Sequence, residues 1–357
     1  MALRIIQVGT GGMGSYWCQA FLPPFIQSGQ IEVVAAVDIV PENLVHAREG
    51  LGLSAGRCYT DAATAFAAHE ADACTIVVPP AAHEAIVDLA LAHGLDILSE
   101  KPIADTMEGS VRIAQKVERA GRKMGVTMSH RFDQDKSTLR SLVHSGDHGP
   151  LDYLVCRFTC DNRKFGSWGH FRHTIIDPLL IEGSIHHLDI LADLAGAPCS
   201  TVYAQTWNPE WGEFAGDSQA LVTMTFGNDT RAMYEGAKTN ASGLNGWSQE
   251  YFRAECRDAT IILDRRAIEI RHHRAEGDSE PRIEQAPLLE RAHWGHAWLI
   301  EQFIDWVNGG PEMPTAVGPN LRSTATMFAA IESSRTGQPV DVQHYYDTAL
   351  ASPADQD

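Results

Sequence analysis

A glycine-rich turn directly after the first predicted strand constrains the fold more than any other feature of this sequence. The chain opens with the apolar run Leu3–Val8, continues as GTGGMG, and then becomes helical in pattern. In this context Gly9 permits a tight turn, Gly11 lets the backbone approach a pyrophosphate, and Gly14 lets the helix pack on the strand. The free N–H groups at the helix start attract phosphates. The turn predicts a dinucleotide-binding Rossmann domain; a glycine turn in an unrelated α/β fold is the alternative.

An acidic residue at the end of the next predicted strand indicates which dinucleotide binds. The strand Glu32–Val37 ends in Asp38. A carboxylate at this place can accept hydrogen bonds from both ribose hydroxyls of the adenosine, and it repels a 2′-phosphate. We therefore expect NAD, with NADP less favoured, although a nearby arginine can reverse this preference.

The first third of the chain alternates short apolar strands with amphipathic helices, which is typical of a parallel sheet with helices on both faces. The strands are predicted at 3–8, 32–37, 73–78, 96–98 and 123–128. We take residues 1–127 as an NAD-binding Rossmann domain. Pro23 and Pro24 should end its first helix early or kink it.

After residue 128 strand-like segments follow one another with few helices between them. They are predicted at 151–159, 201–205, 219–226, 231–236, 250–256, 259–264 and 267–271, with polar loops at 237–249 and 273–287. Several alternate apolar and polar residues, which indicates an antiparallel sheet with one wet face. We predict that residues 128–345 form a substrate-binding and oligomerisation domain of the α+β class, with a large, mostly antiparallel open sheet, and that 346–357 form a C-terminal tail.

The helices of this second domain are too few to cover both faces of its sheet. An uncovered face with apolar positions usually packs against another subunit, so we expect a homodimer or homotetramer.

Composition excludes several classes of partner. The 357 residues include 46 acidic and 28 basic side chains, for a net charge of -18, without a Lys/Arg run. This balance argues against a nucleic acid or an anionic membrane as partner. No apolar run reaches the roughly 18 residues of a membrane span, and the N-terminus does not read as a signal peptide. Seven cysteines without a CxxC pair fit reduced thiols and a cytoplasmic protein.

Two further strand ends carry polar motifs at the edge where parallel sheets bind ligands. Strand 73–78 leads into "PPAAH", which ends at His83, and strand 96–98 leads into Glu100-Lys101-Pro102. Together with the glycine turn and the strand-end aspartate, "VVPPAAHEAIVDLALAHG" and "LSEKP" resemble the Gfo/Idh/MocA oxidoreductases over nearly the whole chain. The resemblance implies that Lys101 lies between nicotinamide and substrate, and that Val78-Pro79-Pro80 replaces the usual Thr-Pro-Asn loop.

A lysine in that place has a chemical rationale. An oxidised nicotinamide is positively charged, so its proximity, together with desolvation, should lower the pKa of Lys101 and ease proton exchange with a substrate hydroxyl. Pro102 would fix the turn, a cis bond being one way to do so. A snorkelling surface lysine is the alternative. The residues expected to bind the cofactor are Gly9, Gly11, Gly12, Met13, Gly14, Asp38, Val78, Pro79, His83, Glu100 and Lys101.

A predicted helix at 180–195 carries a polar stripe on an otherwise apolar surface. At 100° per residue, Glu182, His186, Asp189 and Asp193 fall within about a 60° sector. Buried charge is costly unless it is paired or functional, and histidine exchanges protons near neutral pH. A solvated stripe on a half-buried helix is the alternative, and it fits Asp193 well. The family often carries Asp-x-x-x-His-x-x-Asp here, which implies that His186 is the acid–base residue, with Glu182 at the first position.

Residues outside this helix complete the predicted site. "FGSWGHFRHTIIDPLL" at 165–180 offers aromatic and basic groups that suit stacking on a sugar ring and hydrogen bonding to its hydroxyls or a carboxylate, and "SHRF" at 129–132 follows the last Rossmann strand. A structural loop is the alternative for the first segment. The expected catalytic residues are Lys101, His186 and Glu182. The expected substrate-binding residues are Lys101, His130, Trp168, Arg172, Glu182 and His186.

No metal is expected. Glu182 and His186 with Asp177 or His173 are conceivable zinc ligands, but no HExxH or clustered Cys/His motif supports them. His187 points about 100° away from the stripe, so we expect it to be structural.

These features predict an NAD-dependent dehydrogenase that acts on a secondary alcohol or ketone of a sugar, cyclitol or related polyol. His186 would take the hydroxyl proton, directly or through Lys101, while hydride passes to the nicotinamide. An NAD-dependent glycoside hydrolase that oxidises its substrate transiently is the alternative. A non-catalytic dinucleotide sensor is a third hypothesis, and the presence of both Lys101 and His186 argues against it.

Overall fold

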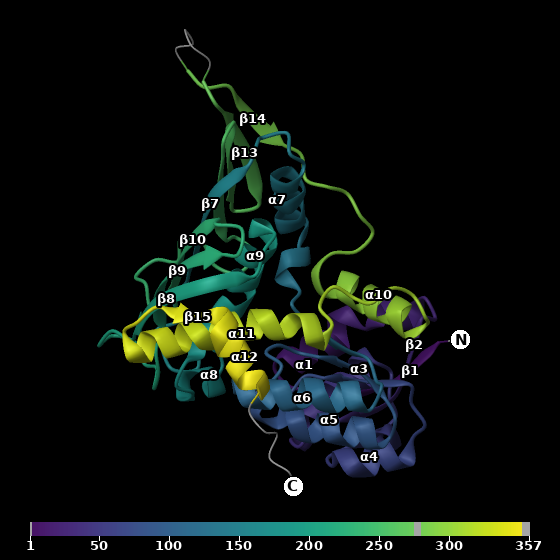
Figure 1. Cartoon of the computed structure of the whole chain (residues 1–357). Coiled ribbons are helices and arrows are strands. Elements are labelled where there is room, and N and C mark those ends of the chain that lie inside the picture. Colours follow the sequence, from purple (N-terminus) through teal and green to yellow (C-terminus); the bar gives the residue numbers. More distant parts are fainter. Residues whose placement is uncertain (1, 275–279, 352–357) are drawn as a thin grey trace. The chain divides into compact units, whose positions relative to one another are not determined.

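The computed structural model describes residues 2–274 and 280–351, and it divides into two compact units (Figure 1). The first unit contains the chain up to Met128 together with the later segment His296–Leu321. The second contains Ser129–Gly295 and Arg322–Ala351. The chain therefore returns to the first unit after it has built most of the second.

The first unit is built on a parallel six-stranded sheet. Its strands are β1 (Leu3–Val8), β2 (Ile31–Val37), β3 (Cys58–Tyr59), β4 (Ala73–Ile76), β5 (Asp96–Ser99) and β6 (Met124–Val126). They lie in the order β3-β2-β1-β4-β5-β6, so the order reverses at β1, beside the glycine turn. β1, β2 and β4 to β6 are almost entirely buried, as expected for parallel strands covered on both faces. The predicted Rossmann architecture is confirmed.

Short helical segments connect these strands. They are α1 (Met13–Tyr16), η1 (Trp17–Phe21), α2 (Pro23–Gln27), η2 (Pro41–Asn43), α3 (Leu44–Gly50), η3 (Ala55–Arg57), α4 (Ala62–Ala68), η4 (Pro80–Ala82), α5 (His83–Ala92) and α6 (Met107–Arg119). The first helix passes into a π-helical segment, η1, and Pro23 then begins α2. Proline is tolerated there because the first helical turn has no internal acceptor for its missing N–H.

The second unit is built on a nine-stranded mixed sheet. Its strands are β7 (Leu151–Thr159), β8 (Cys199–Trp207), β9 (Gln219–Phe226), β10 (Arg231–Ala237), β11 (Tyr251–Cys256), β12 (Ala259–Asp264), β13 (Ala267–His272), β14 (Ile283–Ala286) and β15 (Val340–Asp341). The order is β14-β13-β12-β11-β7-β10-β9-β8-β15. β7 and β10 pair in parallel, and the other neighbours are antiparallel. The predicted large, mostly antiparallel sheet is confirmed.

Strand β14 lies inside the segment 273–287, which the sequence indicated as a polar loop. Its residues Ile283–Ala286 are mostly exposed and not alternating, so the strand is recognised only by its pairing with β13. Residues 275–279 of the same predicted loop lie outside the described residues.

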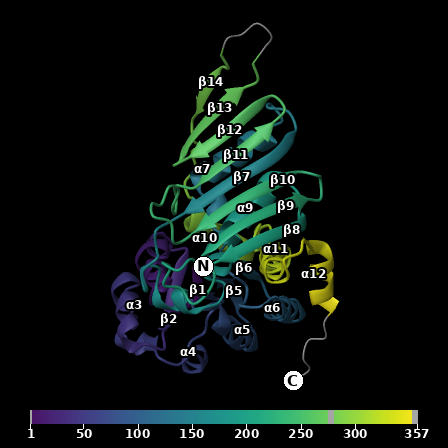
Figure 2. The same ribbon diagram turned by 90° about the vertical axis from the view of Figure 1, so that its left-hand side faces the viewer.

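Helices cover one face of this sheet. The helical segments of the second part of the chain are η5 (His130–Phe132), α7 (Gln134–His144), α8 (His170–Thr174), η6 (Leu179–Ser184), α9 (Ile185–Ala195), α10 (Gly295–Val307), α11 (Val317–Thr336) and α12 (Val342–Ala351). Figures 1 and 2 show α7 and α9 on the same side of the sheet, and α9 packs on β7 and β10. α12 includes the first part of the predicted tail, and residues 352–357 lie outside the described residues.

The other face of the sheet is partly apolar and accessible. Leu221 on β9 and Met233 on β10 are 47% and 50% exposed, whereas their neighbours Ala220 and Ala232 point into the core. Figure 2 shows this face toward the viewer. In the part of the chain that the structure describes, no helix combines the length and apolar character needed to cross a membrane.

Candidate functional site

The glycine turn after β1 has the geometry that only glycine provides. Gly9 has a φ of +87°, and a Cβ atom there would lie 2.0 Å from the carbonyl oxygen of Val77. A Cβ atom on Gly14 would lie 2.3 Å from the carbonyl oxygen of Gly9. The two residues thus allow β1, the turn and α1 to pack closely, which is the strand–turn–helix arrangement in which a helix N-terminus can receive a phosphate. Gly12, exposed, and Met13 stand at the start of this helix.

Asp38 lies at the end of β2 and holds the same turn from the other side. Its carboxylate accepts hydrogen bonds from the backbone N–H groups of Thr10 at 2.8 Å, Gly11 at 3.0 Å and Val40 at 2.9 Å. The side chain of Asn43 donates at 3.2 Å. Burial acts to raise the pKa of Asp38, but these hydrogen bonds outweigh it, so the pKa is lowered and the group is ionised at neutral pH. The glycine turn and the carboxylate of Asp38 therefore form one hydrogen-bonded unit.

His83, at the start of α5, connects the two strand-end motifs. The side chain is fully buried, and its Nε2 lies 3.0 Å from the carbonyl oxygen of Val78 while its Nδ1 lies 3.1 Å from that of Ile103. This places His83 behind the loops rather than at their surface. It fixes the loop that carries Val78 and the exposed Pro79 relative to the loop that carries Lys101.

Glu100 anchors the lysine motif at the end of β5. Its Oε1 accepts a hydrogen bond from the Trp17 indole at 2.9 Å and lies 3.3 Å from Nε2 of His296. Burial alone would raise the pKa of Glu100, but the hydrogen bond and charge of His296, the charge of Lys101 and the indole lower it to about 2. Lys101 is half-exposed beside this ionised group, and its bond to Pro102 is cis.

The second group of predicted residues lies on the second unit, around η6 and α9. His186 is 5% exposed and stacks on His130, with ring centroids 4.1 Å apart and an interplanar angle of 13°. The indole of Trp247 stands nearly perpendicular to both imidazoles, at 5.1 Å from His130 and 6.2 Å from His186. The predicted base is thus packed against a second histidine, with a perpendicular indole beside the pair.

Glu182 and Arg172 form an ion pair. Nε of Arg172 donates to Oε2 of Glu182 at 2.9 Å, and the guanidinium lies over the Trp168 ring at 5.4 Å. Arg172 also donates to the backbone oxygen of Trp168 at 3.2 Å. The structure therefore brings three of the predicted substrate-binding residues together. It gives Glu182 a partner that the sequence did not indicate.

The remaining acids of the predicted stripe are paired. Asp189 lies 3.4 Å from Nε of Arg131 and accepts a hydrogen bond from Ser323 at 2.7 Å. Burial raises its pKa, and the charge of Arg131 opposes this shift. Asp193 lies 2.9 Å from Nε of Arg140. These contacts give both acids a structural explanation.

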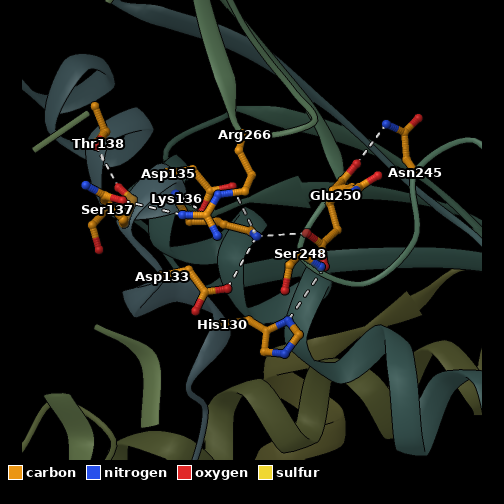
Figure 3. A network of polar contacts seen from close by, with 12 residues as sticks. His130, Asp133, Asp135, Lys136, Ser137, Thr138, Asn245, Ser248, Glu250 and Arg266 are labelled. Atoms are coloured by element: carbon orange, nitrogen blue, oxygen red, sulfur yellow. Dashed lines mark hydrogen bonds and ion pairs between the residues drawn. The ribbon is translucent and has the colours of Figure 1, made fainter. Parts of the chain in front are cut away.

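A buried ionic network supports the histidines (Figure 3). Lys136 on α7, with a side chain 1% exposed, donates to Oε2 of Glu250 at 2.8 Å and lies 3.4 Å from carboxylate oxygens of Asp133 and Asp135. Burial alone would lower the pKa of Lys136, but Glu250, Asp133 and Asp135 outweigh it, so the pKa is raised and the ammonium is kept.

The other oxygen of Glu250 faces the histidines. It lies 3.7 Å from Nδ1 of His130 and 3.7 Å from Nε2 of His187, the latter fully buried against Phe158 and Tyr234. Burial acts to raise the pKa of Glu250, but His187, Lys136 and His130 lower it well below the usual range. Burial lowers the pKa of His187, and Glu250 opposes this shift, so His187 is neutral at pH 7. A fixed negative charge therefore stands behind the His130–His186 stack.

Sequence reasoning missed Trp247, Glu250, Lys136 and Lys238. Trp247 and Lys238 lie in the segment 237–249, which polar composition indicated as a loop. No local pattern indicates that Glu250, at the start of the predicted strand 250–256, and Lys136 are buried together. One signal was available for Lys238, because a charged residue follows directly on the buried strand end Gly236-Ala237. Among the described residues, no group of three His, Cys, Asp or Glu side chains is arranged to hold a metal ion.

The fold and the glycine turn define an NAD-binding oxidoreductase. Residues 3–128 match the family model described as "Oxidoreductase family, NAD-binding Rossmann fold", and residues 140–342 match the model of its "C-terminal alpha/beta domain". The chain therefore belongs to the Gfo/Idh/MocA family, and the resemblance found in the sequence is confirmed. It is an enzyme of the NAD(P)-dependent dehydrogenase class, and NAD is its cofactor.

Similar proteins cover most of the chain. An uncharacterized protein y4oX of Sinorhizobium fredii is 53% identical over 97% of both chains. An inositol 2-dehydrogenase of Mycolicibacterium gilvum is 27% identical, covering 98% of this chain and 96% of its own. Among solved structures, an oxidoreductase from Agrobacterium radiobacter in complex with NAD+, L-tartaric acid and magnesium has a TM-score of 0.81 at 19% identity. That likeness covers 96% of this chain and 99% of the other, and it shows a shared fold.

Proposed function

We propose that this oxidoreductase transfers a hydride between NAD and a secondary alcohol or ketone of a sugar, cyclitol or related polyol. In this proposal residues 1–127 bind the cofactor, and residues 128–345 bind the substrate and mediate self-association. The observation that carries the proposal is the surroundings of His186: a buried imidazole stacked on His130 and perpendicular to Trp247, with the Trp168–Arg172–Glu182 group on the same unit.

This arrangement suits proton transfer from a hydroxyl. His186 takes the hydroxyl proton as the carbon loses hydride, and the negative charge of Glu250 behind His130 stabilises the positive charge that results. When bound, NAD supplies the hydride acceptor at nicotinamide C4. Lys101 supplies a positive charge for the developing alkoxide, which requires that it and His186 reach the same substrate oxygen.

Half-exposed aromatic and guanidinium groups favour a polyol as substrate. Trp168 and Trp247 are half-exposed and offer apolar surface to the C–H groups of a sugar, and Arg172 is a donor beside Trp168. Glu182, held by Arg172, is an acceptor for a second hydroxyl. The inositol 2-dehydrogenase relative and a structural neighbour described as an aldose–aldose oxidoreductase from Caulobacter crescentus support this substrate class.

A turnover assay tests the proposal. Purified protein is mixed with NAD and a panel of aldoses, inositols, sugar acids and aryl glycosides, and both NADH absorbance and aglycone release are followed. Stoichiometric NADH formation on a cyclic polyol is expected. Aglycone release without net NADH would replace the dehydrogenase by a glycoside hydrolase. Binding of NAD without turnover of any panel member would contradict the proposal.

A further inference from the structure

Lys238 is a buried cation enclosed by three aromatic rings. It directly follows β10, its side chain is fully buried, and its Nζ lies 3.9 Å from the ring centroid of Trp168, 4.2 Å from that of Phe158 and 4.6 Å from that of Trp247. Sγ of Cys160 lies 3.7 Å from the same nitrogen. A buried ammonium is costly unless its surroundings compensate for lost hydration. Here the negative faces of the rings supply much of that compensation.

The three rings come from three different segments. Phe158 belongs to β7, Trp168 lies in the connection between β7 and α8, and Trp247 lies in the connection between β10 and β11. The two connections have no regular secondary structure around the tryptophans, so the ladder hydrogen bonds of the sheet do not fix their rings. Lys238 contacts both rings at once and therefore links the two connections.

The same two tryptophans extend to the proposed substrate site. Trp247 lies beside the stacked rings of His130 and His186 and nearly perpendicular to both, and Trp168 carries Arg172 over its ring. Both are half-exposed, whereas Lys238 lies entirely behind them. A shift of either ring would thus change the surface that a substrate meets without removing a group that touches it.

We propose that Lys238 is a positioning residue that holds Trp168 and Trp247 as two aromatic walls for a cyclic polyol. The substrate class in this inference rests on the proposed function. The arrangement of the two rings rests on the cation–π contacts of Lys238. A cyclic polyol, whose C–H groups form a flat apolar face, gains more from two fixed rings than an open-chain polyol does. Cyclic substrates are therefore favoured over linear ones of similar composition.

The charge of Lys238 makes the arrangement depend on pH. Burial lowers its pKa to about 7, the charge of Arg172 acts in the same direction, and Cys160 and Glu250 oppose both. His187 on α9 also interacts with this charge and is neutral at pH 7. The ammonium is present below pH 7 and is lost as the pH rises through 7, so the attraction that holds the two rings weakens in alkaline solution.

Two substitutions of Lys238 and one control test the inference. Lys238→Met keeps the chain length and removes the charge, and Lys238→Arg keeps a charge at every accessible pH. Lys164→Met makes the same change on an exposed lysine, paired with Glu213, in the connection that carries Trp168. We expect Lys238→Met to raise KM for cyclic polyols about tenfold while kcat changes less than about threefold, and Lys164→Met to change neither.

Tryptophan fluorescence supplies a readout that does not depend on turnover. Trp168→Phe and Trp247→Phe identify the contribution of each ring among the eight tryptophans of the chain. The unmodified protein should show a fluorescence change with a midpoint near pH 7, and Lys238→Met and Lys238→Arg should both abolish it. Arginine should also keep KM constant between pH 6 and pH 8.

The two readouts separate the inference from the proposed function. A fluorescence titration that is unchanged in Lys238→Met, or an unchanged KM for cyclic polyols in that variant, would overturn the inference. If both Lys238 variants lose the fluorescence change near pH 7 but the unmodified protein turns over no polyol, the proposed function is wrong. The role of the two tryptophan rings as walls for a sugar is then wrong as well. If Lys238→Met fails to fold, Lys238→Arg and the two Trp→Phe variants decide the outcome.

Discussion

The imidazole rings of His130 and His186 stack at 4.1 Å between centroids, 13° from parallel. Nδ1 of His130 faces the buried carboxylate of Glu250 at 3.7 Å, and Glu250 is in turn paired with Lys136. His186 therefore stands at one end of a chain of contacts that runs through His130 and Glu250 and ends in the ion pair with Lys136. Protonation of His186 places a positive charge close to that carboxylate, which is the electrostatic condition a general base requires.

Removal of the imidazole should abolish most of the turnover without affecting the cofactor. His186→Asn is expected to lower kcat on the best polyol by about 10²-fold or more, because no other group takes the hydroxyl proton at that position. The Kd for NAD, measured by quenching of protein fluorescence, should stay within about twofold. His144→Asn, a histidine of α7 that hydrogen-bonds the Leu194 carbonyl, is the matched control and should retain activity. Equal losses in the two variants would contradict a catalytic role for His186.

Substitution of Lys101 should likewise lower kcat while leaving NAD affinity nearly unchanged. Lys101→Met is expected to lower kcat by about 10²-fold or more, because the developing alkoxide loses its cationic partner. NAD affinity should change little, since we expect the glycine turn and Asp38 to hold the adenosine half of the cofactor. Loss of NAD affinity with preserved kcat at saturating NAD would instead make Lys101 a cofactor-positioning residue. Lys116→Met, a surface lysine of α6 paired with Glu84 and Asp88, is the control.

The sequence was sufficient for those parts of the site that follow from local pattern. The glycine turn, Asp38 and the Glu100-Lys101-Pro102 motif all stand at ends of parallel strands, and one rule of sheet topology places such residues at one edge. His186 was also selected as a candidate from a local pattern, a polar stripe on an apolar helix. These predictions needed no knowledge of which distant segments meet.

Long-range contacts account for what the sequence did not show. Glu182 lies in the π-helical segment η6, so the constant 100° step used for the stripe does not hold between it and His186, and its partner Arg172 comes from α8. Glu250 and Lys136 are 114 residues apart, and they meet because α7 packs on β12 and β13 of the sheet that β11 also belongs to. Lys238 is surrounded by rings from three segments. No local periodicity in the sequence indicates which distant segments contact one another.

Asp38 should determine the choice between NAD and NADP. Its ionised carboxylate repels a 2′-phosphate, so Asp38→Ser combined with an arginine at Ile39, which is 85% exposed, is expected to reverse the preference. Asp38→Asn keeps the size of the side chain and removes the charge. It should weaken NAD binding less than Asp38→Ala, because it retains an acceptor for the N–H groups of Thr10 and Gly11. Isothermal titration with both cofactors measures this, and tighter NADP than NAD binding by the unmodified protein would contradict it.

Glu100 should make the stability of the first unit depend on acid pH. Its pKa falls from the ordinary value of 4.5 to about 2 on folding, so the ionised carboxylate stabilises the fold above about pH 4.5. This contribution, at most about 3 kcal/mol, is lost as the pH falls toward 2. Glu100→Gln should therefore lower Tm at pH 7 and differ progressively less from the unmodified protein at pH 5, 4 and 3. A Tm difference that is independent of pH would mean that the loss comes from packing alone.

The open face of the nine-stranded sheet should mediate self-association. Leu221 and Met233 lie about half-exposed on this face, and Met233 is paired with Val155 of β7. The helices α7 and α9 lie on the other face of the sheet (Figures 1 and 2). An apolar surface of this kind is costly in water and is covered when two copies meet face to face.

The unmodified protein should be a dimer or tetramer by light scattering at micromolar concentration. Leu221→Glu with Met233→Lys should shift it to monomers while the circular dichroism spectrum stays unchanged, because both side chains point away from the core. Leu350→Glu, a partly exposed leucine at the end of α12, is the control and should leave the assembly intact. If the unmodified protein is monomeric under these conditions, the prediction that this face is an interface between copies is wrong.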